Sequence, residues 1–277
     1  MSIISQDDVK SIHKKSPRII AIANQKGGVG KTTTSVNLAA CLAAMHRRVL
    51  LIDLDAQGNA TMGCGVDKSQ LPATIFDVLV LGSPVNEVVA EGTGGLHVVG
   101  ANVDLTGAEI DLIDLDAREY RLKTALAEIN DQYDYVVIDC PPALNLLTVN
   151  ALTAADALII PMQCEYYALE GLSALVTTIQ RVVSQLNPSL KIEGIIRTMF
   201  DPRNSLTKDV SLQLQSHFGD QLYRTVIPRN VRLAEAPSHG LPIIQYDANS
   251  NGAKAYLALA GELLRRESAN RVTDVTH

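Results

Sequence analysis

The sequence predicts a doubly wound α/β fold, with a mostly parallel sheet of about seven strands and helices on both faces. Short apolar runs alternate with amphipathic runs of helical period along most of the 277 residues. The runs 49–52 and 135–138 are continuously apolar, as expected of strands that are covered on both faces. Alternation of such strands with helices favours parallel pairing through helical crossovers.

The elements follow in a regular order. The segment 64–95 contains Pro72, Pro84 and several glycines, and we expect a surface excursion with short helices there. We expect a flexible extension over residues 1–17, a single domain over 18–267 and a frayed tail over 268–277. Strands are predicted at 19–24, 49–53, 96–100, 135–139, 157–161, 192–198 and 222–227, and helices at 32–46, 118–131, 145–154, 168–186, 205–218 and 251–267.

Composition and charge limit the classes of protein to which this chain can belong. No apolar run reaches the ~18 residues of a membrane span, and residues 1–17 lack the apolar core of a signal peptide, so we expect a cytoplasmic protein. The four cysteines lack C-x-x-C spacing, which indicates reduced, mostly buried thiols. The formal charge is −6, yet residues 181–232 hold eight Lys and Arg against four Asp and Glu. One face could therefore bind a polyanion.

The most specific motif is Lys-Gly-Gly-Val-Gly-Lys-Thr-Thr at 26–33, between the first predicted strand and the first predicted helix. Strand, glycine-rich loop and helix are the setting of a phosphate-binding loop. Its glycines let backbone N–H groups turn toward an anion, and the helix N-terminus adds positive potential. Lys31 is expected to reach the β- and γ-phosphates of a nucleotide, and Thr32 to bind Mg²⁺. The predicted nucleotide ligands in this loop are Gly27, Gly28, Val29, Gly30, Lys31, Thr32 and Thr33.

Carboxylates end two of the apolar strands. Asp53 and Asp55 close the second predicted strand, and Asp139 closes the strand at 135–139. The carboxyl ends of parallel strands form the ligand-binding edge of such a sheet. Acidic groups there can organise Mg²⁺ and its waters or orient an attacking water. Asp139 is the expected magnesium residue, because a carboxylate that follows a buried strand downstream of a phosphate loop usually has that role.

The loop departs from the general G-x-x-x-x-G-K-[ST] pattern, because Gln25 replaces the first glycine and Lys26 precedes Lys31 by five residues. This form resembles the deviant phosphate loop of the ParA/MinD ATPases. The string D-x-D-x-Q-G-N from Asp53 and the string Cys-Pro-Pro after Asp139 resemble that family's two switch regions. The resemblance implies that Lys26 reaches the nucleotide of a partner subunit. It also implies that Asp55 supports hydrolysis close to the metal and the attacking water, whereas Asp53 has a structural role.

Residues 227–240 resemble a signature of the chromosomal, Soj-type ParA proteins. In that group a basic surface from this region binds DNA non-specifically, and the same loop lies near the adenine. The resemblance implies Met199 and Pro228 as adenine-wall residues. The candidate DNA ligands, which could instead pair with nearby acids, are Arg203, Lys208, Arg229 and Arg232.

The resemblance implies a DNA-segregation ATPase that works in the cytoplasm on the nucleoid. ATP and Mg²⁺ would join two subunits into a homodimer that binds double-stranded DNA, and a ParB-type partner would stimulate slow hydrolysis and release. Three alternatives stay open. A MinD-like membrane-cycling ATPase is disfavoured, because residues 263–270 form no broad apolar face for a stable membrane contact. A non-hydrolysing scaffold is disfavoured by Asp55 and Asp139. A positioning ATPase for another cargo, such as a plasmid or a protein cluster, fits equally well.

Overall fold

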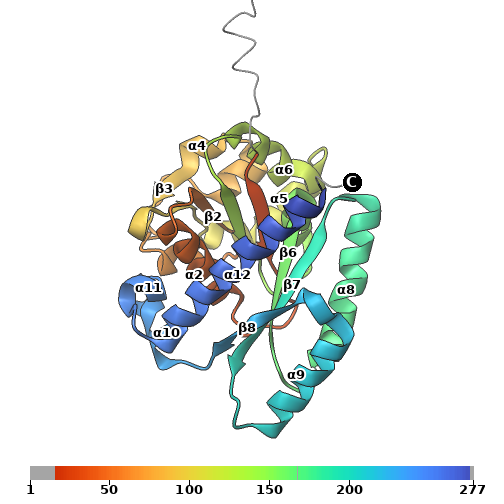
Figure 1. The fold of residues 1–277 in the computed structure, drawn as a ribbon. Helices are drawn as coiled ribbons and strands as arrows, with labels where there is room; N and C mark the ends of the chain where they lie inside the picture. Colours follow the sequence, from red (N-terminus) through yellow and green to blue (C-terminus); the bar gives the residue numbers. More distant parts are fainter. Residues whose placement is uncertain (1–15, 167, 275–277) are drawn as a thin grey trace, which may run out of the picture.

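A computed structural model describes residues 16–166 and 168–274. Eight strands form one sheet in the order β3-β4-β2-β5-β1-β6-β7-β8, with β1 in its interior (Figure 1). Neighbouring strands are parallel, apart from the antiparallel pair of β3 with β4. The strands are β1 (Arg18–Ile22), β2 (Val49–Asp53), β3 (Val89–Glu91), β4 (His97–Val99), β5 (Tyr135–Asp139), β6 (Ala157–Gln163), β7 (Lys191–Phe200) and β8 (Leu222–Pro228).

The predicted fold class and all seven predicted strands are confirmed, and β3 is the addition. β3 is a three-residue edge strand whose residues are half-buried or exposed, so it shows no continuous apolar run. The surrounding segment contains the expected short helices, among them α4 (Val85–Val88), but part of it is buried rather than on the surface. Ile75, Val78 and Leu79 are fully or almost fully buried, and they pack into the core on one face of the sheet.

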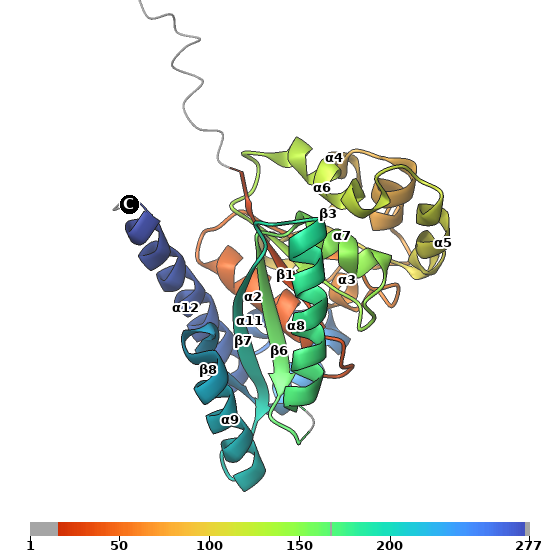
Figure 2. The ribbon, with the colours of Figure 1, turned by 90° about the vertical axis from the view of Figure 1, so that its right-hand side faces the viewer.

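Helices cover both faces of the sheet, and Figure 2 shows α12 and α8 on opposite sides of it. Side chains of β1 alternate between two apolar clusters, as a strand's period of two requires: Ile20 and Ile22 pack with α2 and α12, and Ala21 packs with α7 and α8. The helices are α2 (Lys31–Ala44), α3 (Asn59–Gly63), α4 (Val85–Val88), α5 (Ala108–Ile113), α6 (Arg121–Leu126), α7 (Leu146–Ala154), α8 (Ala168–Gln185), α9 (Ser205–Phe218), α10 (Val231–Glu235), α11 (Ile243–Tyr246) and α12 (Asn251–Asp274).

Two predicted helices differ from the observed ones. The helix expected at 118–131 is broken into α6 and two short 3₁₀ turns, η4 (Arg118–Tyr120) and η5 (Ala127–Ile129). Asn150 of α7 explains the first break, because its amide donates to the Arg118 carbonyl and accepts from the Leu122 N–H. α12 continues to Asp274, past the predicted end at 267. Among the described residues, no helix is both long and apolar enough to cross a bilayer.

Candidate nucleotide-binding site

The glycine-rich loop joins the end of β1 to the start of α2 and is open above its backbone. Gly28 has φ 72° and Gly30 has φ 86°, a left-handed conformation that favours glycine. No atom lies within 4 Å of a Cβ built on Gly27 or Gly28. α2 begins at Lys31, and its N-cap residue Gly30 supplies no side-chain cap, so the first N–H groups of the helix remain available. The loop is therefore a concave anion site at a helix N-terminus.

The two lysines of the loop point to different partners. Lys31 is buried, and its Nζ donates to the Lys26 carbonyl at 3.0 Å. Burial lowers the pKa of Lys31, while the nearby Asp139 carboxylate opposes that shift. The Lys26 side chain is half-exposed and forms an ion pair with Glu165, in the segment that follows β6. Lys31 thus lies inside the loop, and Lys26 extends away from it.

Asp53 and Asp139 are fully buried and occupy paired positions, side by side, on the adjacent parallel strands β2 and β5. Asp53 accepts hydrogen bonds from the Thr61 N–H and hydroxyl, both at 2.8 Å, and from the Asp55 N–H at 3.1 Å. Burial nevertheless raises the pKa of Asp53 to about 6. These bonds attach the end of β2 to α3.

Asp139 has one oxygen with a partner and one without. Its Oδ1 accepts from the Ser35 hydroxyl of α2 at 2.7 Å, whereas its Oδ2 is buried with no hydrogen-bond partner. Burial, followed by the Asp53 charge, raises the pKa of Asp139 to about 8. A buried carboxylate oxygen without a donor is costly unless a cation or water completes it. The site therefore fits a Mg²⁺ ion beside the Thr32 hydroxyl.

Asp55 lies half-buried just past the end of β2. Its Oδ1 accepts from the Gln57 N–H at 3.0 Å, and its charge acts on both Lys31 and Asp139. The turn after it requires glycine at 58: φ is 60° there, and an added Cβ would lie 2.6 Å from the Ala101 carbonyl oxygen. Asp55 is thus held on the same edge of the sheet as the loop and Asp139.

A cavity of about 250 Å³ adjoins the loop and contains both residues expected at the adenine, Met199 and Pro228. Thr198 on β7 connects this cavity to the loop, because its hydroxyl donates to the Val29 carbonyl at 2.8 Å. Met199 has φ 48°, an uncommon conformation for a residue with a side chain. Sequence reasoning missed Thr198, Asn230 and Tyr256 as lining residues; a threonine inside an apolar strand was the one available signal.

The candidate DNA ligands separate into two groups. Arg203 pairs with Asp201, and the charge of Arg229 also acts on Asp201, so these arginines lie near the ends of β7 and β8. Lys208 follows in the first turns of α9. Arg232 lies three residues after Arg229, on α10, and pairs with Glu235 and Asp247.

Arg197 reduces the basic surplus counted from the sequence. Its guanidinium donates to the Ser211 hydroxyl and to the Tyr223 and Arg224 carbonyls. It is turned toward the interior, and burial lowers its pKa. It therefore contributes to packing between β7, β8 and α9 rather than to an exposed basic face.

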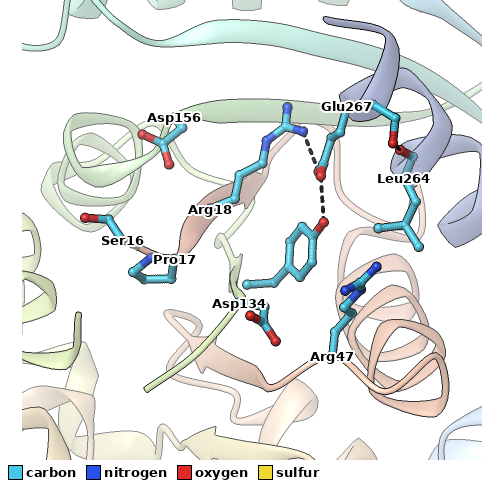
Figure 3. A pocket seen from close by; sticks show the side chains of 10 residues that line it. Ser16, Pro17, Arg18, Arg47, Asp134, Asp156, Leu264 and Glu267 are labelled. Atoms are coloured by element: carbon cyan, nitrogen blue, oxygen red, sulfur yellow. Dashed lines mark hydrogen bonds and ion pairs between the residues drawn. The ribbon is translucent and has the colours of Figure 1, made fainter. Parts of the chain in front are cut away.

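A second cavity, of about 340 Å³, lies where β1 and β5 begin, at the other end of the sheet from the loop. Figure 3 shows the side chains that line it. Arg18 forms ion pairs with Glu193 and Glu267, and the Tyr135 hydroxyl donates to Glu267 at 2.6 Å. These contacts connect α12 to the first strand, which is a structural role.

The fold and the loop together define a P-loop ATPase with two lysines in its phosphate loop. The family model described as an AAA domain matches residues 17–192. The chain is 55% identical to the sporulation initiation inhibitor protein Soj of Bacillus subtilis, over 89% of this chain and 98% of the relative. It is 53% identical to the chromosome partitioning protein ParA of Caulobacter vibrioides, over 90% of this chain and 95% of the relative.

A solved structure of cobyrinic acid a,c-diamide synthase from Mycobacterium smegmatis, with bound ATP analog and magnesium, has the same fold. Its TM-score is 0.81 at 38% identity, and the match covers 92% of this chain and 97% of that one. The chain belongs to the ParA/Soj family of chromosome-partitioning ATPases.

ATP and Mg²⁺ are the cofactors of this ATPase, and the residues present fit them. The loop N–H groups and Lys31 would hold the phosphates, and Thr32 with Asp139 would hold the metal. Bound Mg²⁺ supplies neutralisation of the charge on the phosphates. The protein's own contribution is preorganisation: Ser35 fixes the Asp139 carboxylate, and the Thr198 hydroxyl fixes the loop at Val29.

Proposed function

We propose that this chain is a DNA-segregation ATPase that works as an ATP-joined homodimer. Two copies would face each other across two nucleotides, bind double-stranded DNA without sequence preference, and release it after hydrolysis stimulated by a ParB-type partner. The observation that carries the proposal is the division of labour between the lysines. Lys31 lies inside the loop of its own chain, whereas the half-exposed Lys26 leaves the loop and pairs with Glu165. Lys26 would exchange that carboxylate for the phosphates of a second copy's nucleotide.

Replacing Lys26 by alanine tests the dimer. Lys26→Ala should bind ATP with near-normal affinity yet remain a monomer in ATP and Mg²⁺ and hydrolyse no ATP, because its cation acts in trans. Lys31→Ala should instead lose ATP binding, and Lys123→Ala, at an exposed position of α6, should resemble the wild type. Titration calorimetry and light scattering give the two readouts. A normal ATP-dependent dimer of Lys26→Ala would contradict the proposal.

The DNA surface is proposed to consist of Arg203, Lys208 and Arg229 from each subunit, with Arg232 secondary because two carboxylates already pair with it. Six phosphate contacts per dimer would give a slope of about −5 in a plot of the logarithm of the DNA-binding constant against the logarithm of the salt concentration. A monomer with three such contacts would bind DNA weakly. DNA binding should therefore need ATP and ignore sequence. The same binding would place the protein on the nucleoid.

Lys208→Ala with Arg229→Ala should lower the DNA affinity of the ATP dimer and leave ATP affinity unchanged, because phosphate contacts are remote from the nucleotide. Lys123→Ala is again the matched control. Fluorescence anisotropy on two unrelated duplexes, over a salt series, measures the effect. Equal DNA binding with and without ATP would contradict the proposal that DNA binding requires the ATP-dependent dimer. It would favour a positioning ATPase for another cargo.

A further inference from the structure

The backbone of Lys26 is fixed on both sides, whereas its side chain is held by a single ion pair. The Lys26 N–H donates to Asn24 Oδ1 at 3.0 Å, and the Lys26 carbonyl accepts from Lys31 Nζ at 3.0 Å. Asn24 in turn donates to the Pro161 carbonyl of β6 at 2.8 Å. The Lys26 ammonium pairs with the Glu165 carboxylate. The direction of this ammonium therefore depends on Glu165.

Glu165 is placed beside the loop by the segment that follows β6. β6 ends at Gln163, and the Glu165 N–H donates to the Gln163 carbonyl at 3.0 Å. The Gln163 amide contacts the Met199 sulfur, so this segment is also attached to β7. β6 lies between β1 and β7 in the sheet. The carboxyl ends of these parallel strands lie at the edge that carries the phosphate loop, so Glu165 belongs to that edge.

The pair between Lys26 and Glu165 is open to water. The side-chain exposure is 50% for each partner. An exposed ion pair typically favours the paired form by a factor of about 1.5 to 5, whereas a buried pair is far costlier to break. The contact is therefore strong enough to bias the Lys26 ammonium and weak enough to open when a stronger anion competes for it.

We propose that Glu165 is a positioning residue that restrains Lys26 in the free protomer and so raises the protein concentration at which two copies join through ATP. This inference rests on the proposed function, in which Lys26 acts on a second copy's nucleotide. The phosphates of that nucleotide would compete with the Glu165 carboxylate for one ammonium. Each dimer would form by opening two such pairs, so the restraint would raise the dimer dissociation constant by a factor of about 2 to 30.

Replacing Glu165 by glutamine removes the charge and keeps the shape of the side chain. With Mg²⁺ and a non-hydrolysable ATP analog, the dimer dissociation constant of Glu165→Gln should be about 2 to 30 times lower than that of the wild type. Light scattering over a dilution series at low salt measures it. Glu165→Asp keeps the charge and should lie closer to the wild type. Glu128→Gln, at an exposed position of η5, removes the same charge elsewhere and is the matched control.

Salt and lysine reactivity report on the ion pair itself. The difference between Glu165→Gln and the wild type should shrink between about 0.05 M and about 0.5 M salt, because exposed charges are screened. In the nucleotide-free protein, an amine-acetylating reagent should modify Lys26 about 1.5 to 5 times faster in Glu165→Gln than in the wild type, because the carboxylate shields the Nζ atom. Mass spectrometry gives the rates, and Lys123 of α6 should react equally in both proteins.

The outcomes separate the restraint from the dimer. Equal acetylation of Lys26 in the wild type and Glu165→Gln would overturn the restraint. An unchanged dimer dissociation constant in Glu165→Gln would overturn it too, and a higher one would make Glu165 a contact of the dimer instead. Failure of the wild type to dimerise with the ATP analog would refute the proposed function and, with it, the role of the restraint. Faster acetylation of Lys26 in Glu165→Gln would then still establish the ion pair.

Discussion

Replacing Asp139 by asparagine should change the free energy of unfolding by an amount that depends on pH. The variant should be the less stable protein at low pH and should recover relative to the wild type as pH rises. The pKa of Asp139 is raised to about 8 by burial and by Asp53, against about 3.9 in an unfolded chain. Between these values the folded state binds a proton that the unfolded state lacks. The free energy of unfolding of the wild type therefore falls as pH rises through this window. Asparagine does not titrate, so its variant lacks this loss.

The magnitude follows from the window. Each pH unit within it costs about 1.4 kcal/mol, so the variant should gain about 2 to 3 kcal/mol on the wild type between pH 5.5 and 7.5. At pH 5.5 the variant should be the less stable protein by about 1 to 3 kcal/mol. Its amide would place a donor or acceptor at the Oδ2 position, where the structure offers no partner. The deficit of the variant should therefore shrink or reverse between these pH values.

Urea denaturation of the protein without nucleotide or Mg²⁺, over pH 5 to 8.5, measures the difference. Asp209→Asn is the control, because that carboxylate is exposed on α9 and its replacement should give a small difference that hardly changes with pH. ATP hydrolysis should be lost in Asp139→Asn at every pH. A stability difference between Asp139→Asn and wild type that stays constant from pH 5.5 to 7.5 would refute the reasoning about a buried carboxylate with a raised pKa.

Two further changes have distinct expected results. Asp55→Ala should bind ATP, dimerise and persist on DNA, because only turnover depends on its carboxylate; rapid phosphate release by this variant would overturn that role. Glu267→Gln should lower the free energy of unfolding in urea by about 1 to 3 kcal/mol, because it weakens charged contacts to Arg18 and Tyr135. ATP affinity should be unchanged in Glu267→Gln, since its cavity lies at the other end of the sheet, and a large loss of ATP binding would contradict this.

The sequence predicted the fold where local pattern and tertiary environment agree. β2 and β5 read as continuous apolar runs because both of their faces are covered, and the loop glycines mark where backbone must approach an anion. Prediction from the sequence failed where short elements form only through contacts with residues distant in the chain. β3 has three residues and exists because β4 pairs with it, and the helix predicted at 118–131 breaks where the Asn150 side chain enters its first turn.

The same division applies to the site. The placement of the loop, Asp55 and Asp139 on one edge of the sheet was predictable, because each directly follows a strand that the sequence marks; their roles stay predictions. Thr198 was not, because its relevance comes from a hydrogen bond to a carbonyl 169 residues earlier. Charge counting also could not show that Arg197 turns inward, or that Arg203 and Arg232 pair with nearby acids.

The central place of β1 in the sheet has a consequence for synthesis on the ribosome. This strand is made first among the eight, yet its neighbours β5 and β6 begin more than a hundred residues later. Helix α2, which carries the loop, is covered by α12, and Thr34 and Tyr256 hydrogen-bond across that contact at 3.2 Å. The phosphate loop therefore cannot reach its final form until almost the whole chain has emerged. Such distant pairing makes folding slow and leaves the early strand exposed, so a nascent chain of this protein should depend on chaperones until α12 is complete.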